Sequence, residues 1–223
     1  MTIGFRINTD VARASDEVMN RFNYIPTAHI SDSMQRLHAA GAALRPMHRS
    51  GKLIGNAVTV KVRPGDNLMV HKAIDTAQPR DVIVVDAGGD LSQAIIGELM
   101  MRHAQRRGIA GLVINGAVRD MGTISNDIYP VYAAGITHRG PYKDGPGEIN
   151  FPVSIGGMVI HPGDIIVGDE DGVVAIPLAD AEAVLVLTEA LRLREEKVMR
   201  EILDGTVDRS WVDAALKAKG FKG

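Results

Sequence analysis

GELMMRHAQRRGIAGLVINGAVRD, the stretch from Gly97 to Asp120, decides the fold of this chain. Its apolar pattern predicts a helix over residues 97–107 and then a buried strand, so Glu98 opens the helix whereas Arg119 and Asp120 follow the strand. In a right-handed β-α-β crossover, the turn before the helix and the turn after the second strand lie at the carboxyl ends of parallel strands. We therefore expect the two loops to converge at one edge, where a small anion and a divalent metal could sit.

The composition limits the classes of function open to the chain. It has 223 residues, of which 45% are apolar and only 4% aromatic, so aliphatic side chains must fill a sizeable core. The net charge of −2 provides no basic surface for nucleic acid. Cysteine is absent, which excludes disulfides, thiolate catalysis and zinc–thiolate sites. No apolar run approaches a bilayer span and the N-terminus lacks a secretory pattern, so we expect a cytoplasmic protein that does not bind membranes.

Helices are expected before the first strand. The sequence predicts one helix from Val11 to Phe22. A second helix would begin with Thr27 or Ser31 as its N-cap and would end at Gly41.

Strand and turn signals dominate the middle of the chain. Alternating or continuous apolar runs predict buried strands, and turns that contain glycine separate the later ones. The expected strands lie within residues 55–62, 82–86, 111–115, 127–133 and 149–177. Between the first two, Asp66 would cap a helix over residues 67–77.

We interpret residues 1–223 as a single α/β domain with N-terminal helices and a long C-terminal helix. Its core covers about residues 25–200, and a helical tail occupies residues 204–223. The long amphipathic helix, residues 179–203, is expected to extend beyond the globule and meet another subunit.

The ordered set of motifs resembles the RraA-like family. This family contains the class II 4-hydroxy-4-methyl-2-oxoglutarate/4-carboxy-4-hydroxy-2-oxoadipate aldolases and the regulators of ribonuclease activity. The resemblance implies a β/β/α swivelling-type fold, homotrimers or homohexamers, and a metal-dependent site between subunits. The segments that carry it are HISDS at 29–33, GE at 97–98, GxxGxVxxGxxRD at 108–120, GG at 156–157, PGD at 162–164 and GDxDGVV at 168–174.

The resemblance also implies roles for individual residues. Asp120 would ligate Mg²⁺ or Mn²⁺, and Arg119 would bind the pyruvyl oxygens as a planar fork of donors. The backbone amides of Leu99 and Met100, at the start of a helix, would hold the substrate carboxylate. Gly97 would let the substrate approach closely. A structural explanation also exists, in which Asp120 only caps the next turn and Arg119 only forms an ion pair with Asp120 or Glu98.

Acidic residues complete the implied catalytic set. Glu98 lies twenty intervening positions before Arg119, as in the aldolases, and would orient metal-bound water, although the helix dipole alone also favours an acid there. The active aldolases tend to carry another acid where this chain has Thr123. An acid from a neighbouring subunit would be Glu195 or Glu196, and a solvated helix face that pairs with nearby Arg and Lys side chains is the other explanation.

The leading hypothesis is a divalent-metal-dependent lyase that acts on pyruvyl-type 2-keto acids. Retro-aldol cleavage of a 4-hydroxy-2-oxoacid would leave a pyruvate enolate, with a base provided by metal-bound hydroxide positioned by Glu98 or by a partner carboxylate. Oxaloacetate decarboxylation would form the same pyruvate enolate, stabilised by the metal and Arg119, but it needs no such base. This reaction therefore depends less on the acid that Thr123 replaces. The alternatives are a non-catalytic regulator that binds an RNA-degrading enzyme, and a different metal-dependent lyase or hydratase.

Overall fold

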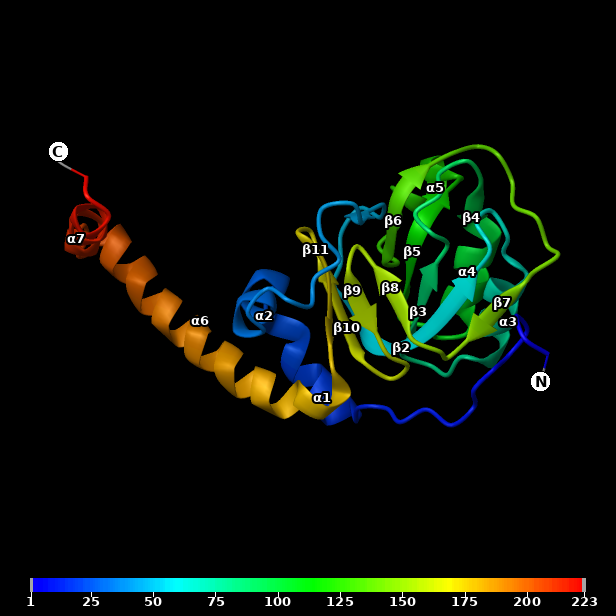
Figure 1. Ribbon diagram of the computed structural model, residues 1–223, viewed down its shortest axis with the longest axis horizontal. Coiled ribbons are helices and arrows are strands. Elements are labelled where there is room, and N and C mark those ends of the chain that lie inside the picture. Colours follow the sequence, from blue (N-terminus) through cyan, green and yellow to red (C-terminus); the bar gives the residue numbers. More distant parts are fainter. Residues whose placement is uncertain (1, 222–223) are drawn as a thin grey trace.

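A nine-stranded mixed sheet forms the centre of the protein, in a computed structural model that describes residues 2–221 (Figure 1). Four of its strands run parallel to one another in the spatial order β6-β5-β3-β2. They are β2 (Leu53–Val62), β3 (Asp81–Asp86), β5 (Gly111–Val118) and β6 (Val131–Ile136). Every residue of β3 is buried, as expected for a continuous apolar run in a strand that is covered on both faces.

Antiparallel strands extend this parallel centre. β10 joins β2 and carries β11 at its other side, while β1 pairs with β6 and β7 pairs with the end of β2. A separate two-stranded sheet is formed by β8 and β9. These strands are β1 (Arg45–Pro46), β7 (Gly147–Ile149), β8 (Val153–Ile155), β9 (Met158–Ile160), β10 (Ile165–Asp169) and β11 (Gly172–Ile176).

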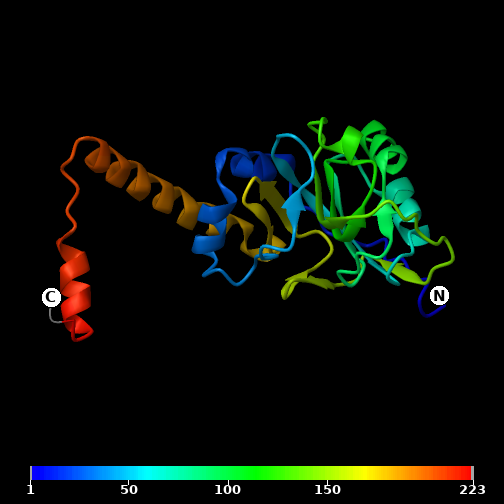
Figure 2. The ribbon, with the colours of Figure 1, turned by 90° about the horizontal axis from the view of Figure 1, so that it is seen from above.

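Helices cover the sheet and extend from it. Helices α3 and α4 pack their apolar residues into one core cluster with β2, β3 and β5, and α1, α2 and α6 form another cluster with β10 and β11. Helix α6 then leaves the β-rich body, so that α6 and α7 project as an arm (Figures 1 and 2). The helices are α1 (Asp16–Arg21), α2 (Thr27–Ser33), α3 (Leu68–Thr76), α4 (Glu98–Arg106), α5 (Met121–Ile124), α6 (Ala181–Leu203), α7 (Ser210–Ala218), and the short 3₁₀ turns η1 (Phe22–Tyr24) and η2 (Leu178–Asp180).

The β-α-β unit predicted at the opening stretch is confirmed. β4 (Ala94–Ile96) runs parallel to β5, and α4 connects them. Because both strands end at the same edge, Gly97 and Arg119 become neighbours, and the Arg119 N–H donates to the Ile96 carbonyl at 3.1 Å. This edge positions the candidate site.

The predicted helix from Val11 to Phe22 is wrong in its first half. The helix begins only at Asp16, after Ser15, whose side chain accepts from the Val18 N–H. The preceding segment is held extended because Arg13 pairs with Asp81 at 2.9 Å and the Ala14 N–H bonds to a distant asparagine side chain. Tertiary contacts therefore override the local helical pattern.

The second predicted helix is also shorter than expected. It ends at Ser33 instead of Gly41, because the following chain is pinned to β11 through the Ala40 N–H and the Val173 carbonyl. Neither Thr27 nor Ser31 is its N-cap. Instead, the Asp169 carboxylate on β10 accepts from the N–H and the hydroxyl of Thr27 at 2.8 and 2.5 Å.

The remaining element predictions are largely confirmed. The strand expected over 127–133 begins only at Val131, because Asp127 turns the chain by accepting from the Tyr129 N–H at 2.8 Å. No helix among residues 2–221 is long and apolar enough to cross a membrane. The expected tail, residues 204–223, is helical in α7, and its last two residues lie outside the described part, as does residue 1. The single domain over 1–223 stays a prediction.

Candidate active site

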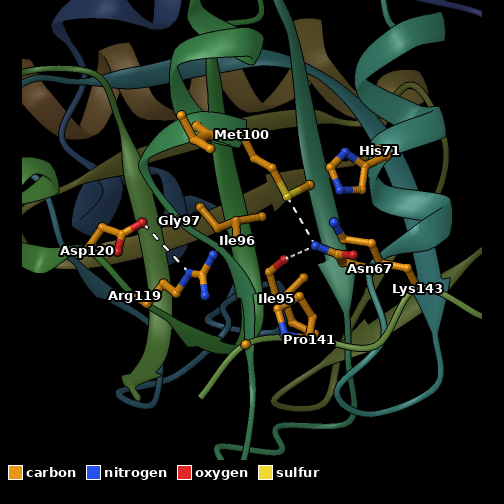
Figure 3. Close-up of a pocket in the computed structure, with 12 residues that line it drawn as sticks. Asn67, His71, Ile95, Ile96, Gly97, Met100, Arg119, Asp120, Pro141 and Lys143 are labelled. Carbon is orange, nitrogen blue, oxygen red and sulfur yellow. Dashed lines mark hydrogen bonds and ion pairs between the residues drawn. The ribbon is translucent and has the colours of Figure 1, made fainter. Parts of the chain in front are cut away.

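A cleft of about 290 Å³ opens at the edge where β4 and β5 end (Figure 3). One side carries Arg119 and Asp120, and the other carries Asn67, His71 and Lys143. The cleft is lined by Asn67, His71, Ile95, Ile96, Gly97, Leu99, Met100, Arg119, Asp120, Gly140, Pro141 and Lys143. Five of the six residues predicted for the site therefore line one cleft, and Glu98 is the exception.

Gly97 allows the turn after β4 and the turn after β5 to come into direct contact. A Cβ atom at this position would lie 2.3 Å from Asp120 Oδ2 and 2.9 Å from Arg119 Cγ, so no larger residue fits without a shift of both side chains. The Glu98 N–H donates to Asp120 Oδ2 at 2.9 Å. The absence of a side chain at Gly97 thus allows the aspartate to reach the start of α4.

Asp120 adopts the left-handed conformation, with φ 61° and ψ 39°. It occupies the N-cap position of α5, yet its side chain makes no capping hydrogen bond there, so a capping role does not account for the Asp120 carboxylate. Backbone strain of this kind persists where the surroundings enforce it, and here it directs the carboxylate toward α4. The side chain is 42% exposed, and only Oδ2 is used in a hydrogen bond within residues 2–221.

Asp120 fits a magnesium-type ion by its chemistry. Mg²⁺ prefers oxygen ligands, retains several waters, and is often bound through one or two carboxylates together with substrate oxygens. Within residues 2–221, no group of three or more His, Asp or Glu side chains forms a complete metal cage. The residues present therefore suit an ion that shares its coordination with water and substrate, and do not suit a dedicated structural metal.

Arg119 lies against Asp120 and beneath the loop that closes the cleft. Its Nε is 3.8 Å from Asp120 Oδ2, which confirms the ion pair expected between these two residues. A Cβ at Gly140 would lie only 3.1 Å from a terminal guanidinium nitrogen, so the loop approaches the arginine closely. The guanidinium is about two-fifths exposed and can donate to a small anion.

The start of α4 provides the backbone donors predicted for an anion. The Met101 N–H makes the helix's first backbone bond, to the Gly97 carbonyl at 3.1 Å. Leu99 and Met100 precede this bond, and the amides of a first helical turn have no acceptor within the helix. Both residues line the cleft, so they can serve an oxygen-rich ligand there.

Asn67, His71 and Lys143 are site residues that sequence reasoning missed. Asn67 is only 2% exposed and donates to the Ile95 carbonyl at 2.9 Å, while its own buried Oδ1 has no partner within residues 2–221. Burial, together with the nearby Lys143 charge, lowers the pKa of His71, so the imidazole is neutral at pH 7. The i,i+4 spacing of Asn67 and His71 after the Pro-Gly-Asp turn was the available signal.

A buried aspartate fastens the loop that carries Lys143. Asp66 accepts from the N–H groups of Leu68, Asp144 and Gly145 at 2.8–3.0 Å, and from Arg63 at 3.2 Å. Burial alone would raise the pKa of Asp66, but these donors outweigh it and lower the pKa. Asp66 was predicted as the cap of α3, but the N-cap position of this helix is Asn67. The Asp66 carboxylate accepts from the Leu68 N–H from one residue earlier, and it joins the start of α3 to the loop that carries Lys143.

Glu98 points its carboxylate away from the cleft. Glu98 Oε2 accepts from the Thr123 hydroxyl at 3.1 Å, and Oε1 is 3.8 Å from Arg102 Nε. Its backbone N–H contacts Asp120, but its side chain does not line the cavity. The ion pair considered between Arg119 and Glu98 is not formed, because Arg102 takes that place.

Glu195 and Glu196 lie on α6, which leads away from the β-rich body of the same chain (Figure 1). Glu196 pairs with Arg192 at 2.5 Å, as the solvated-face explanation expects. Glu195 instead contacts Nε2 of His29 at 2.5 Å, which joins α6 to α2. The entry of either acid into a neighbouring subunit's site stays a prediction.

Comparison with known proteins identifies relatives of the whole β-rich body. The RraA-like family, described as Aldolase/RraA, matches residues 27–175. A protein of Halalkalibacterium halodurans, provisionally named 4-hydroxy-4-methyl-2-oxoglutarate aldolase, is 39% identical over 197 residues, which cover 88% of this chain and 94% of the relative.

Solved structures show the same fold. An uncharacterized protein from Pseudomonas syringae pv. tomato superimposes with a TM-score of 0.80 at 26% identity, covering 89% of this chain and 93% of the other. RraAS2 of Streptomyces coelicolor, described as an unusual member of the RNase ES inhibitor RraA family, gives 0.76 at 25% identity, covering 84% and 98%. The α/β architecture with N-terminal helices and a long C-terminal helix, the family profile and the relatives agree, and the chain belongs to the RraA-like family.

Proposed function

We propose that this protein is a divalent-metal-dependent carbon–carbon lyase that acts on pyruvyl-type 2-keto acids. One observation carries the proposal: a guanidinium, a carboxylate and the free amides of a helix start converge on one small cleft. These are a donor fork, a metal ligand and an anion site, which together match a carboxylate next to a keto group. The aldolase name of the relative at 39% identity supports the same class of reaction.

The substrate would be oriented by the β4–β5 edge. Its C1 carboxylate would accept hydrogen bonds from the Leu99 and Met100 amides, and its 2-keto oxygen would face the Arg119 guanidinium. A divalent cation, Mg²⁺ or Mn²⁺, would be held by Asp120 and would supply positive charge next to the keto oxygen. Arg119 is thereby placed to neutralise the negative charge that grows on this oxygen.

The side of the cleft formed by Asn67, His71 and Lys143, which we call the far wall, favours a substrate with a second carboxylate. Lys143 and neutral His71 lie across the cleft from Arg119, and Lys143 brings a positive charge there. The relative's name denotes an oxoglutarate derivative, which has two carboxylates. We therefore propose 4-hydroxy-2-oxo diacids and oxaloacetate as the substrate class.

The bond that breaks joins C3 to C4 of the substrate. Its electron pair moves into the C2–C3 bond and gives the enolate of pyruvate, which Arg119 stabilises and which then takes a proton at C3. In the retro-aldol reaction a base must also remove the 4-hydroxyl proton, and we propose Glu195 or Glu196 of a second copy in a homotrimer or homohexamer. Oxaloacetate releases CO₂ instead and needs no base.

The test is a coupled assay for pyruvate. Purified protein with oxaloacetate and Mg²⁺ is expected to form pyruvate, and both EDTA and Asp120→Ala are expected to abolish turnover above the uncatalysed rate. Turnover that is unaffected by EDTA, or absent with Mg²⁺ and with Mn²⁺, would contradict the proposal. The same assay with 4-hydroxy-4-methyl-2-oxoglutarate separates decarboxylation from aldol cleavage.

A second candidate function is regulation of an RNA-degrading enzyme. It is favoured by the likeness to the Streptomyces protein described as an RNase ES inhibitor family member, and by the α6–α7 arm. The arm exposes large apolar side chains that a partner could cover, at Leu193, Met199, Leu203 and Trp211. Inhibition of a purified ribonuclease of this type, in a preparation without lyase activity, would decide for the regulator.

A further inference from the structure

The carboxylate of Glu98 is engaged on both oxygens, and neither contact faces the cleft. Glu98 Oε2 accepts from the Thr123 hydroxyl at 3.1 Å, and Oε1 lies 3.8 Å from Arg102 Nε. Thr123 is on α5, whereas Arg102 is one turn further along α4 than Glu98. The side chain of Glu98 therefore joins two helices that flank Asp120 in space and in sequence.

Arg102 extends this connection beyond α5. Its guanidinium also donates to Asp127, whose carboxylate is 13% exposed and accepts from the Tyr129 N–H. Thr123, Glu98, Arg102 and Asp127 thus form a continuous polar chain, which we name the α4–α5 clamp. It fixes the first turn of α4 against α5 and against the turn that follows α5.

The clamp closes a ring of contacts around Asp120. The main chain of Glu98 donates to Asp120 Oδ2 at 2.9 Å, the side chain of Glu98 binds Thr123, and the Thr123 N–H donates to the Asp120 carbonyl at 3.0 Å. The carboxylate and the main-chain carbonyl of Asp120 are therefore both held by residues of the clamp. A left-handed aspartate needs such support, because the conformation is unfavourable for a residue with a Cβ.

We propose that Glu98, with Thr123 and Arg102, is a positioning residue that holds Asp120 in its metal-binding geometry, and that Glu98 does not act on the substrate. This inference rests on the proposed function, because it assigns Asp120 to a divalent cation. It differs from the water-orienting role that the resemblance implies for Glu98. What matters at position 98 is then an acceptor for the Thr123 hydroxyl, and a negative charge is not essential.

Four substitutions separate these roles. Glu98→Gln keeps an acceptor for Thr123, whereas Glu98→Ala removes it; Thr123→Val removes the hydroxyl, whereas Thr123→Ser keeps it. The measurement is the dissociation constant of Mn²⁺, followed by electron paramagnetic resonance of free Mn²⁺. Glu98→Ala and Thr123→Val are each expected to weaken binding about tenfold, the size seen when partners of metal ligands are removed.

The conservative variants decide the outcome. Glu98→Gln and Thr123→Ser are expected to stay within about threefold of the wild-type Mn²⁺ affinity. Ser125→Ala, which removes a hydroxyl just after α5 and outside the clamp, serves as control. If Glu98→Gln binds Mn²⁺ as poorly as Glu98→Ala, the charge is required and the inference is wrong. It is also wrong if Thr123→Val binds like the wild type.

A second measurement distinguishes a failure of the clamp inference from a failure of the proposed lyase function. If the wild type binds Mn²⁺ but cleaves no 2-keto acid, the proposed function fails, and the Mn²⁺ affinities still judge the clamp. If the wild type binds no Mn²⁺, a double-mutant cycle of Glu98→Ala and Thr123→Val in thermal unfolding judges it. Non-additive changes in melting temperature support the clamp, and strictly additive changes overturn it.

Discussion

The backbone N–H of Glu98 and the carboxylate of Asp120 are hydrogen-bonded at 2.9 Å, although 22 positions separate them in the sequence. The bond joins the end of β4 to the end of β5, so it fixes the distance between the helix-start amides and the aspartate. One of the two aspartate oxygens is used in this bond. The geometry of the cleft therefore depends on the strand pairing beneath it.

Gly97→Ala tests how closely the two loops must approach. The new methyl would lie 2.3 Å from Asp120 Oδ2 and must displace the carboxylate or the start of α4. We expect kcat/KM for oxaloacetate to fall about 100-fold, the size expected for a misplacement of about 1 Å. Gly122→Ala is the control, because a Cβ there meets no atom within 4 Å. Equal activity of the two variants would contradict the close-approach argument.

Asp120→Asn tests the charge of the proposed metal ligand without disturbing the chain. Asparagine also tolerates the left-handed conformation and can still accept from the Glu98 N–H, so the fold should persist. We expect turnover to fall at least 1000-fold and Mn²⁺ binding to be lost, because the anionic oxygen ligand is gone. Circular dichroism checks the fold. A variant that retains wild-type Mn²⁺ affinity would exclude Asp120 as the ligand.

Lys143→Ala tests whether the far wall holds a second carboxylate. The lysine faces the cleft from the loop opposite Arg119, so its loss should raise KM for oxaloacetate about tenfold and leave inhibition by pyruvate nearly unchanged. Steady-state kinetics with both compounds give the comparison. Lys72→Ala, on the exposed side of α3, is the control. A parallel loss of pyruvate affinity would show that Lys143 binds the keto-acid end instead.

Asp66→Asn tests whether the Asp66 carboxylate holds the loop that carries Lys143. The test follows how the free energy of unfolding depends on pH. The lowered pKa of Asp66 means that its contribution to stability is fully present above the unfolded value of about 3.9 and is lost as the pH falls through the folded pKa. We expect the variant to lose about 1–3 kcal/mol of unfolding free energy at pH 7.

The difference in melting temperature between wild type and Asp66→Asn should shrink below about pH 4, where the unfolded wild type takes up a proton first and the folded state does so only at lower pH. Scanning calorimetry from pH 3 to pH 8 measures it. Asp144→Asn, in the same loop but three-quarters exposed, should show little effect at any pH. A difference that is constant down to pH 3 would contradict the assignment.

The sequence allowed the positions of the main elements to be predicted where local signals and burial agree. The apolar run 82–86 is a fully buried strand, and Gly108, with φ 76°, follows α4 where a helix end was expected. The convergence of Arg119 and Asp120 with the start of α4 followed from strand parallelism alone.

Other features depended on contacts that no local pattern encodes. Residues 11–14 are not helical, and Arg13 instead reaches Asp81, more than sixty positions away. Lys143 reaches the cleft on a loop that buried Asp66 and main-chain hydrogen bonds of Tyr142 hold in place. The direction of the Glu98 side chain depends on Thr123, a residue that seemed only a departure from the aldolase pattern.

The left-handed backbone at Asp120 has a consequence for how this protein can diverge. Among the residues that adopt this conformation at the least cost, asparagine and glycine are the main alternatives, and both remove the negative charge. If Asp120 is the metal ligand that we propose, a single codon change at this position would therefore silence the proposed lyase chemistry while the fold remains intact. Under the proposed function, a chain of this architecture that only recognises other proteins would thus differ from a catalytic one by a single substitution.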